Sequence, residues 1–288
     1  EARISNRNPL LMSSLHATTR TTTKTSSEAF VPTRLSRKKG LSLLDDVILP
    51  QQQYGERIEF GRDAQGLDGS TLVLGSDPLM SFTYGEFPTP STDQLVDRAL
   101  QYIQQDDNAP SLNFIDLGSG CGRLVFYTAL TRGDSQRPWH VHGIEISDIL
   151  HKVATERGLQ SGLQAGHFFP TTTTENNPLT DNAATCDMNT LSLHLGPADK
   201  FSDLLGKAHI IFAYSTTWET SGFSGELGAM ILDHSWNELL AQSCSKGCIV
   251  ITTDRALDPS YGWELLCPSL EVENREVAGS MGYIQVLR

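Results

Sequence analysis

The chain has 288 residues, of which 39% are hydrophobic and 19% are charged, and its formal net charge is −12. This length suits one or two globular domains with a sizeable core. No run approaches the roughly 18 apolar residues that a membrane-spanning helix requires, so no membrane partner is expected. An acidic body offers no broad surface for nucleic-acid phosphates, so direct nucleic-acid binding by that body is not expected.

The first 40 residues differ from the rest. They contain eight Lys or Arg, two acids and thirteen Ser or Thr, a net charge of +6, which leaves −12 − 6 = −18 for the remainder. Without apolar periodicity, residues 1–40 are predicted to be a disordered basic tail that resembles an organellar transit peptide. Ala29-Phe30-Val31-Pro32 also resembles the cleavage motif of algae with secondary plastids. A plastid is therefore the expected location; the alternatives are the nucleus, with a weak signal at Arg37-Lys38-Lys39, and the cytoplasm.

The five cysteines indicate neither a disulfide framework nor a metal site. Their number is odd, and Cys244 and Cys248 are separated by three residues rather than by the two of a zinc knuckle. No His, Cys and acid cluster has metal-ligand spacing. Reduced, buried thiols and no bound metal are expected.

Residues 41–90 are predicted to be a lead-in that ends in the loop Tyr84-Gly85-Glu86-Phe87. Short strands are expected at 58–60, 71–74 and 80–82, between Gly and Asp turns. Residues 91–288 then form the main domain. Its first helix starts at Ser91, in a predicted capping box with Gln94.

The main domain alternates between apolar strands and helices. A polar insertion at about 159–189 interrupts it, and a long helix is predicted over 224–243. The expected strands are 112–117, 139–144, 191–195, 208–214 and 247–253, followed by a closing β hairpin of 263–266 and 283–287. This order predicts an α/β fold with a doubly wound, mostly parallel seven-stranded sheet.

Three glycines follow the first of these strands, in the pattern D-x-G-x-G-x-G from Asp116 through Gly118 and Gly120 to Gly122. The dinucleotide pattern G-x-G-x-x-G fails, because its sixth position is Arg123 or Val125. The Lys-Ser/Thr of a P-loop is missing too. Such a turn lets the backbone approach a ligand at the carboxyl edge of the sheet.

Two acids extend this predicted site. Glu145 ends the next strand, where a carboxylate can accept hydrogen bonds from both hydroxyls of a ribose. Asp199 follows the third strand and is either an acceptor for an adenine amino group or a solvated loop residue.

The glycine pattern resembles motif I of class I S-adenosylmethionine (SAM) methyltransferases. Together with Tyr84-Gly85-Glu86 and Gly143-Ile144-Glu145, it makes residues 80–288 resemble the catalytic core of the Dot1-like methyltransferases. The resemblance implies a Rossmann-like fold and SAM as cofactor. It also implies that Tyr84 and Glu86 lie over the methionine part of SAM and that Glu145 binds the ribose.

The segment after the fourth strand departs from the histone-methylating members. Paired asparagines are replaced by Tyr214-Ser215-Thr216-Thr217-Trp218, a version that resembles the plant and algal Dot1-like proteins. Arg123 stands where the histone enzymes have a polar amide, and their basic nucleosome-binding extension is not visible. Tyr214, Ser215 and Trp218 are predicted to line the acceptor side, although Tyr214 and Trp218 are equally well explained as packing residues.

These patterns predict an enzyme that transfers a methyl group from SAM to an amine, in particular a lysine of an unidentified protein. Transfer from a sulfonium depends chiefly on alignment of the nucleophile. The predicted catalytic set is Tyr84, Glu86, Tyr214, Ser215 and Trp218. The alternatives are a non-catalytic SAM-fold interaction module, a histone lysine methyltransferase proper and a nucleotide-dependent reductase.

Overall fold

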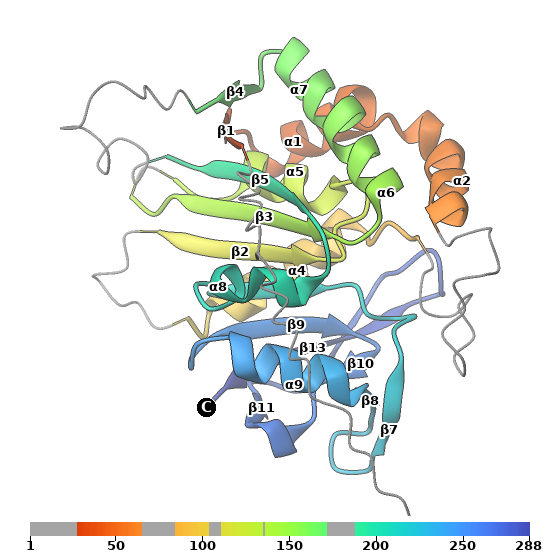
Figure 1. Ribbon diagram of the computed structural model, residues 1–288, viewed down its shortest axis with the longest axis vertical. Coiled ribbons are helices and arrows are strands. Elements are labelled where there is room, and N and C mark those ends of the chain that lie inside the picture. Colours follow the sequence, from red (N-terminus) through yellow and green to blue (C-terminus); the bar gives the residue numbers. More distant parts are fainter. Residues whose placement is uncertain (1–27, 65–83, 104–110, 135, 172–187) are drawn as a thin grey trace, which may run out of the picture.

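The computed structural model describes residues 28–64, 84–103, 111–134, 136–171 and 188–288. Within these ranges a mostly parallel sheet carries helices on both faces, and a small second sheet lies beside it (Figure 1). No helix in these ranges is long and apolar enough to cross a bilayer. The predicted strands at 71–74 and 80–82, and most of the predicted insertion, lie outside the described residues.

The main sheet has ten strands, and its spatial order is β11-β13-β9-β6-β2-β3-β5-β1-β4, with β12 paired to β13. These strands are β1 (Ala29–Pro32), β2 (Leu112–Leu117), β3 (Trp139–Glu145), β4 (Phe168–Pro170), β5 (Thr190–Leu195), β6 (Ile210–Ala213), β9 (Ile249–Thr253), β11 (Trp263–Leu265), β12 (Leu270–Val272) and β13 (Ser280–Leu287). The five strands from β9 to β5 run parallel, whereas β13 is antiparallel to both β9 and β11. All seven predicted strands are therefore present in the predicted doubly wound arrangement, and β1, β4 and β12 extend the sheet.

The chain enters the parallel sheet at its centre. From β2 it moves outward through β3 and β5, and it then returns to build β6 and β9 on the other side of β2. The direction of winding thus reverses between β2 and β6. Ligands of doubly wound folds bind at the carboxyl edge beside such a reversal.

Helices cover both faces of this sheet. They are α1 (Arg37–Leu43), η1 (Leu44–Ile48), η2 (Gln51–Gln53), α2 (Tyr54–Ala64), α4 (Thr89–Leu100), α5 (Arg123–Thr131), α6 (Asp148–Lys152), η3 (Val153–Leu159) and α7 (Gln160–Gln164), then η4 (Ala198–Phe201), α8 (Ser202–Leu205), α9 (His234–Ser243) and η5 (Pro259–Tyr261). Helices α1, α4, α5 and α6 contribute to one core cluster, and α8 and α9 to the other.

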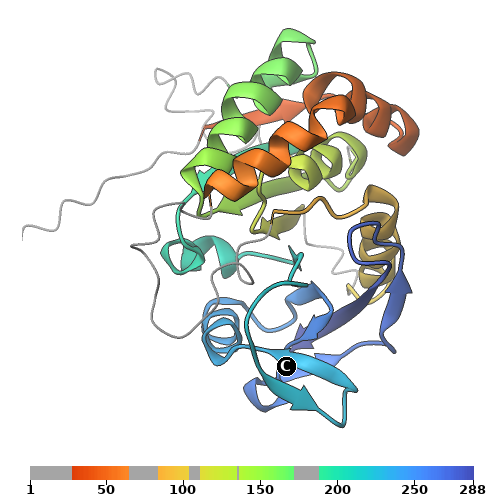
Figure 2. The same ribbon diagram turned by 90° about the vertical axis from the view of Figure 1, so that its right-hand side faces the viewer.

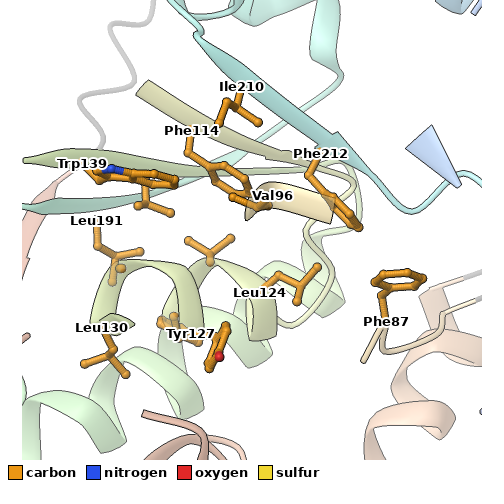
Figure 3. Packing of buried hydrophobic residues seen from close by; sticks show 14 of the residues in the cluster. Phe87, Val96, Phe114, Leu124, Tyr127, Leu130, Trp139, Leu191, Ile210 and Phe212 are labelled. Atoms are coloured by element: carbon orange, nitrogen blue, oxygen red, sulfur yellow. The ribbon is translucent and has the colours of Figure 1, made fainter. Parts of the chain in front are cut away.

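Successive residues of the central strands alternate between these two clusters. Phe114 packs in the cluster of α5, whereas Ile115 belongs to the cluster of α8 and α9. In Figure 3, Phe114 and Leu191 face the helix that carries Leu124 and Leu130. Each buried side chain of this size contributes roughly 1.5–3 kcal/mol. Burial on both faces is why these strands are apolar throughout.

Residues 29–40 contradict the predicted disordered tail. Strand β1 pairs antiparallel with both β5 and β4, and Phe30 is buried in the core. Arg37 at the start of α1 forms a two-point ion pair with Asp97 of α4. The motif Ala29-Phe30-Val31-Pro32 is thus a strand of the sheet. The composition of the whole 40-residue segment obscured this short β-favouring run, whose partners lie more than 130 residues away.

The segment predicted as one helix over 224–243 also differs. Its first half belongs to the hairpin of β7 (Thr220–Ser224) and β8 (Ala229–Leu232), and β10 (Arg255–Ala256) pairs with β8 to complete the second sheet. Helix α9 starts only after Asp233, whose carboxylate accepts a hydrogen bond from the Ser235 amide. This hairpin lies at the opposite end of the molecule from α7 (Figures 1 and 2).

Two smaller predictions are corrected as well. Residues 58–60 lie in helix α2 rather than in a strand. Helix α4 starts at Thr89, and the Ser91 hydroxyl donates to the carbonyl of Glu273 at 2.6 Å instead of capping the helix. At the start of the predicted insertion, residues 159–170 continue η3 and form α7 and β4.

Candidate active site

A cavity of about 590 Å³ opens at the carboxyl edge of the parallel strands, next to the reversal between β2 and β6. Its lining comes from the loop before α4, the glycine turn after β2, the segments that follow β3, β5 and β6, and helices α2, α5, α6 and α9. Of the residues predicted from the sequence, those that line it are Tyr84, Glu86, Asp116, Gly118, Gly120, Glu145, Asp199, Tyr214 and Trp218. Gly122 and Ser215 do not.

The glycine turn is shaped by left-handed backbone at Gly118, Gly120 and Gly122, whose φ angles are +76°, +55° and +79°. Residues other than glycine rarely adopt such φ angles. A Cβ on Gly120 would lie 2.9 Å from the ring of Tyr84, and one on Gly118 would lie 3.4 Å from the ring of Trp218. These two rings therefore rest against the backbone of the turn.

Gly122 has a structural role. It is the N-cap of α5, and a Cβ there would lie 2.9 Å from the ring of Phe126. A Cβ there would also lie 3.2 Å from Cβ of Ala154, so the lack of a side chain lets η3 pack closely against the start of α5. Gly122 does not line the cavity. Gly122 is thus the predicted cofactor-binding residue that supports the structure of the turn without lining the cavity.

Glu145, at the end of β3, is tied to the glycine turn. Its Oε2 accepts a hydrogen bond from the amide of Gly120 at 2.6 Å, and its Oε1 accepts from the amide of Ser147 at 2.8 Å. Burial raises the pKa of this carboxyl, and the two amide hydrogen bonds oppose that rise. The two signals that the sequence placed 23 residues apart, the turn and the acid, thus meet in one site.

Asp116, at the end of β2, is buried and lines the same cavity. Among the described residues its carboxyl has no hydrogen-bond partner. Burial and, secondarily, the charge of Glu145 raise its pKa to about 8. A buried carboxyl in this position favours a cationic or proton-donating group of a ligand.

The Tyr84-Gly85-Glu86 loop is fixed by an arginine that sequence reasoning missed. Glu86 accepts from Arg57 Nε at 2.5 Å and Nη2 at 3.2 Å, and from the Tyr84 hydroxyl at 2.7 Å. Arg57 is only 2% exposed. Because its carboxylate is paired in this way, Glu86 holds the loop over the turn and is not a free base. Arg57 carried no signal, because it lies just before the strand predicted at 58–60 and nothing in the sequence links it to Glu86.

The loop is also held from the far end of the chain. Glu276, in the turn between β12 and β13, accepts from the amide of Glu86 at 2.8 Å and from the Tyr214 hydroxyl at 3.3 Å. A Cβ on Gly85 would lie 2.1 Å from Oε2 of Glu276. Glycine at position 85 is therefore needed for this contact.

The segment after β6 divides into cavity residues and a structural residue. Tyr214 lines the cavity, and burial raises the pKa of its hydroxyl to about 12. Trp218 lines it too and stacks on Trp236 of α9, with ring centroids 4.3 Å apart. Ser215 is fully buried and exchanges hydrogen bonds with the backbone of Thr253 at 2.8 and 3.1 Å. The predicted acceptor-side role of Ser215 is therefore wrong.

The lining residues that the predicted site did not contain include two charged residues, Arg123 and Glu219, and the aromatic Trp236. Glu219 is exposed and forms no ion pair among the described residues. The position of Arg123 directly after the last glycine was a usable signal. Trp236 was hidden by its assignment to the long predicted helix. Across the described ranges, no group of three or more His, Cys, Asp or Glu side chains has the arrangement of a metal site.

No model of a known protein family matches the chain, and no curated protein matches it. Several solved structures are distantly similar. An RNA methyltransferase from Salinibacter ruber, in complex with S-adenosyl-L-homocysteine (SAH), is 19% identical over 70% of this chain and 94% of its own, with a TM-score of 0.35. The rRNA methyltransferase AviRa from Streptomyces viridochromogenes is 15% identical over 75% and 89%, with a TM-score of 0.42. The magnesium protoporphyrin IX methyltransferase of Synechocystis PCC 6803, with bound SAH, is 13% identical over 84% and 98%, with a TM-score of 0.39.

All three TM-scores lie below 0.5, so the assignment of function rests on this chain's own cavity. The fold is the doubly wound, mostly parallel fold expected of a class I methyltransferase. Its cavity lies where that fold binds a ligand, at the carboxyl edge beside the reversal of winding.

Proposed function

We propose that this chain is a SAM-dependent methyltransferase of the Dot1-like type and that its acceptor is an amine, the side chain of a lysine in a protein. Two features support SAM as the cofactor. The turn from Gly118 to Gly120 exposes backbone to the cavity where a side chain would block a ligand. Oε2 of Glu145 accepts a hydrogen bond from the amide of Gly120 in that turn at 2.6 Å. A glycine cradle next to a buried acid suits a nucleoside that carries an amino acid.

Each part of the cofactor has residues suited to it. Glu145 would hold the ribose hydroxyls, Asp199 would accept a hydrogen bond from the adenine amino group, and Tyr84, whose ring lies against Gly120, would cover the methionine part. When bound, SAM supplies an electrophilic methyl group on a sulfonium. The chain itself contributes alignment and the exclusion of water.

The observation that carries the choice of an amine is that Glu219, whose carboxylate forms no ion pair within the described ranges, lines the same cavity as Trp218 and Trp236. Trp218 lies against Gly118 and stacks on Trp236. A carboxylate and indole faces attract an ammonium group. They disfavour the phosphate of a nucleic acid, as does the net charge of −12.

The amine must lose its proton before it attacks. Glu219 is the cavity carboxylate nearest in sequence to the tryptophan pair, and it is free of ion pairs within the described ranges, so it is the group suited to receive that proton. The Tyr214 hydroxyl stays neutral at physiological pH because its pKa is raised to about 12. It therefore takes part as a hydrogen-bonding group that helps to orient the acceptor.

Membership of the Dot1-like family is supported by the Tyr84-Gly85-Glu86 loop. Its tyrosine ring packs on the glycine turn, and its glutamate is locked by Arg57. This is where the family's loop is expected, over the methionine part of the cofactor. The segment after β6 supports the plant and algal type rather than the histone methylases.

Incubation with methyl-labelled SAM and fractionated extract tests the proposal. We expect the label on lysine residues of a protein fraction, identified by mass spectrometry. Glu219→Gln should lower the rate of labelling about tenfold, within the range for a general base. The matched control, Glu226→Gln in the β7–β8 turn, should leave it unchanged. Label only in RNA or in a small molecule would contradict the choice of acceptor, and no labelling in any fraction would contradict the enzyme.

A further inference from the structure

Behind Tyr214, a chain of hydrogen bonds starts at Asp254 and runs through the turn between β12 and β13. The carboxylate of Asp254 accepts three hydrogen bonds, one of them from the Ser280 hydroxyl at 2.8 Å. An ionised carboxylate can only accept, so the Ser280 proton points toward Asp254. The Ser280 oxygen in turn accepts from Nδ2 of Asn274, also at 2.8 Å. The direction of these hydrogen bonds is therefore fixed from Asp254 onward.

Asn274, which is 1% exposed, continues this direction to Tyr214. Its Oδ1 accepts from the amide of Glu276 at 3.1 Å, which fixes which end of the side-chain amide is the nitrogen. Nδ2 carries two hydrogens. One is donated to Ser280 and the other to the Tyr214 hydroxyl, at 2.9 Å. Because an amide NH₂ group only donates, Tyr214 accepts in this hydrogen bond.

The proton of the Tyr214 hydroxyl points to Glu276. Burial raises the pKa of Tyr214 to about 12, so the hydroxyl keeps its proton, and Oε2 of Glu276 accepts it at 3.3 Å. Although Glu276 is exposed, its Oε1 is held by two donors, the Tyr54 hydroxyl and the Glu86 amide. One lone pair of the Tyr214 oxygen is then left, since Asn274 takes the other.

Tyr214 lines the cavity beside the loop proposed to cover the methionine part of SAM. A Cβ on Gly85 of that loop would lie 3.0 Å from Cε1 of Tyr214. The sulfonium belongs to the methionine part, so the remaining lone pair lies on the side where the methyl group is transferred. A lone pair there attracts a hydrogen-bond donor and repels another acceptor.

We propose that Asn274 and Glu276 are positioning residues that hold the Tyr214 hydroxyl as a pure hydrogen-bond acceptor toward the cavity. Tyr214 then selects a group that carries hydrogen at the transfer position, such as an N–H of the attacking amine. The inference rests on the proposed function, and it adds the C-terminal turn to the residues that determine the acceptor.

Two ligands test the direction of this hydroxyl without the unidentified acceptor. Sinefungin has an amine-bearing carbon where SAM has the methyl-bearing sulfur, whereas SAH has a bare sulfur. The two share the adenosine and the amino-acid end. Titration calorimetry of both with the full chain gives the ratio of their dissociation constants, and thermal unfolding checks that each variant is folded.

Tyr214→Phe should weaken sinefungin by about tenfold, the range of a charge-assisted hydrogen bond, and SAH by less than about twofold. Glu276→Gln should do the same without touching either ligand. Its oxygen stays with the Tyr54 and Glu86 donors, so its NH₂ group faces Tyr214 and turns the hydroxyl proton into the cavity, against the ammonium of sinefungin. Glu271→Gln, an exposed change of equal charge on β12, is the control and should leave the ratio unchanged.

The double variant, Tyr214→Phe with Glu276→Gln, should lose no more selectivity than Tyr214→Phe, because Glu276 acts through the hydroxyl. Additive losses, an unchanged ratio in either single variant, or equal losses of both ligands would overturn the inference and leave the proposed function in place. A wild-type chain that binds neither ligand would instead contradict the proposed cofactor.

Discussion

At the scale of single residues, the site depends on where side chains are absent. Gly120 has a φ of +55° and lies under the ring of Tyr84, so it needs both an unusual backbone angle and free space. Gly166, after α7, has a φ of +70° with no atom near its missing Cβ. Both glycines therefore have left-handed backbone, but only Gly120 has a neighbouring side chain that a Cβ would contact.

This difference gives a matched pair of variants. Gly120→Ala and Gly166→Ala should each lose about 1–2 kcal/mol of unfolding free energy, the cost of left-handed backbone. Gly120→Ala alone should also abolish SAM binding, because its methyl group displaces Tyr84. Chemical denaturation and calorimetry measure both effects. If Gly120→Ala bound SAM normally, the turn would not contact the cofactor.

A second residue-scale prediction concerns Glu145. Glu145→Gln should weaken SAM and 5′-methylthioadenosine alike, by about tenfold or more, because it removes charge-assisted hydrogen bonds to the ribose that both ligands share. Calorimetry with both ligands tests it, with exposed Glu59→Gln as the control. Unchanged affinities would show that Glu145 does not bind the ribose.

The third concerns pH. Burial raises the pKa of Asp116 from 3.8 to about 8, so the folded chain holds this proton more tightly than the unfolded chain does. Its contribution to stability is full below pH 4 and is lost as the pH rises toward 8. Asp116→Asn removes this loss, so the variant should gain stability relative to wild type between pH 4 and 8, by up to about 1.4 kcal/mol per pH unit.

Urea unfolding of ligand-free wild type and Asp116→Asn at pH 5, 6, 7 and 8 measures that trend. The same substitution should weaken SAM, since an amide, unlike the carboxyl, cannot ionise to pair with a cationic group of the ligand. A stability difference independent of pH would mean that Asp116 titrates normally.

At the scale of elements, the sequence predicted the features that depend on neighbouring residues, namely the central strands and the glycine turn. Burial on both faces requires a continuous apolar run, which marks β2, β3, β6 and β9 in the sequence. Left-handed backbone favours glycine, which marks the turn. The contacts that assemble the loop before α4 were not predicted. Arg57 meets Glu86 across 29 residues and Glu276 meets it across 190. Nothing in a single sequence marks such pairs.

Strand β1 was also missed in the sequence, because its partner strands β4 and β5 are distant in the chain. Its burial yields a prediction. Phe30 is 8% exposed, whereas Phe169, one residue along in the paired strand β4, is 50% exposed. Phe30→Ala should cost about 3 kcal/mol of unfolding free energy, and Phe169→Ala about 0.5 kcal/mol or less. Equilibrium denaturation compares them. Equal, small losses would indicate that residues 29–32 are not part of the folded sheet.

At the scale of the whole molecule, the sheet assembles the site from distant parts of the chain. The sheet brings the glycine turn, Glu145 and the segment after β6 to one edge, although they are spread over about 100 residues. The order of elements predicted that the glycine turn and Glu145 meet, and the family resemblance added the segment after β6. The sequence did not predict the N-terminal layer that reaches the site through Arg57, because the contact of Arg57 with Glu86 depends on packing between segments distant in the chain.

The central claim is that this cavity binds SAM. Titration of the purified full chain with SAM, in parallel with NADPH, tests it most directly. We predict saturable binding of one SAM per chain, weakened by Glu145→Gln, and no binding of NADPH. Binding of NADPH without SAM, or no heat with either, would contradict the claim.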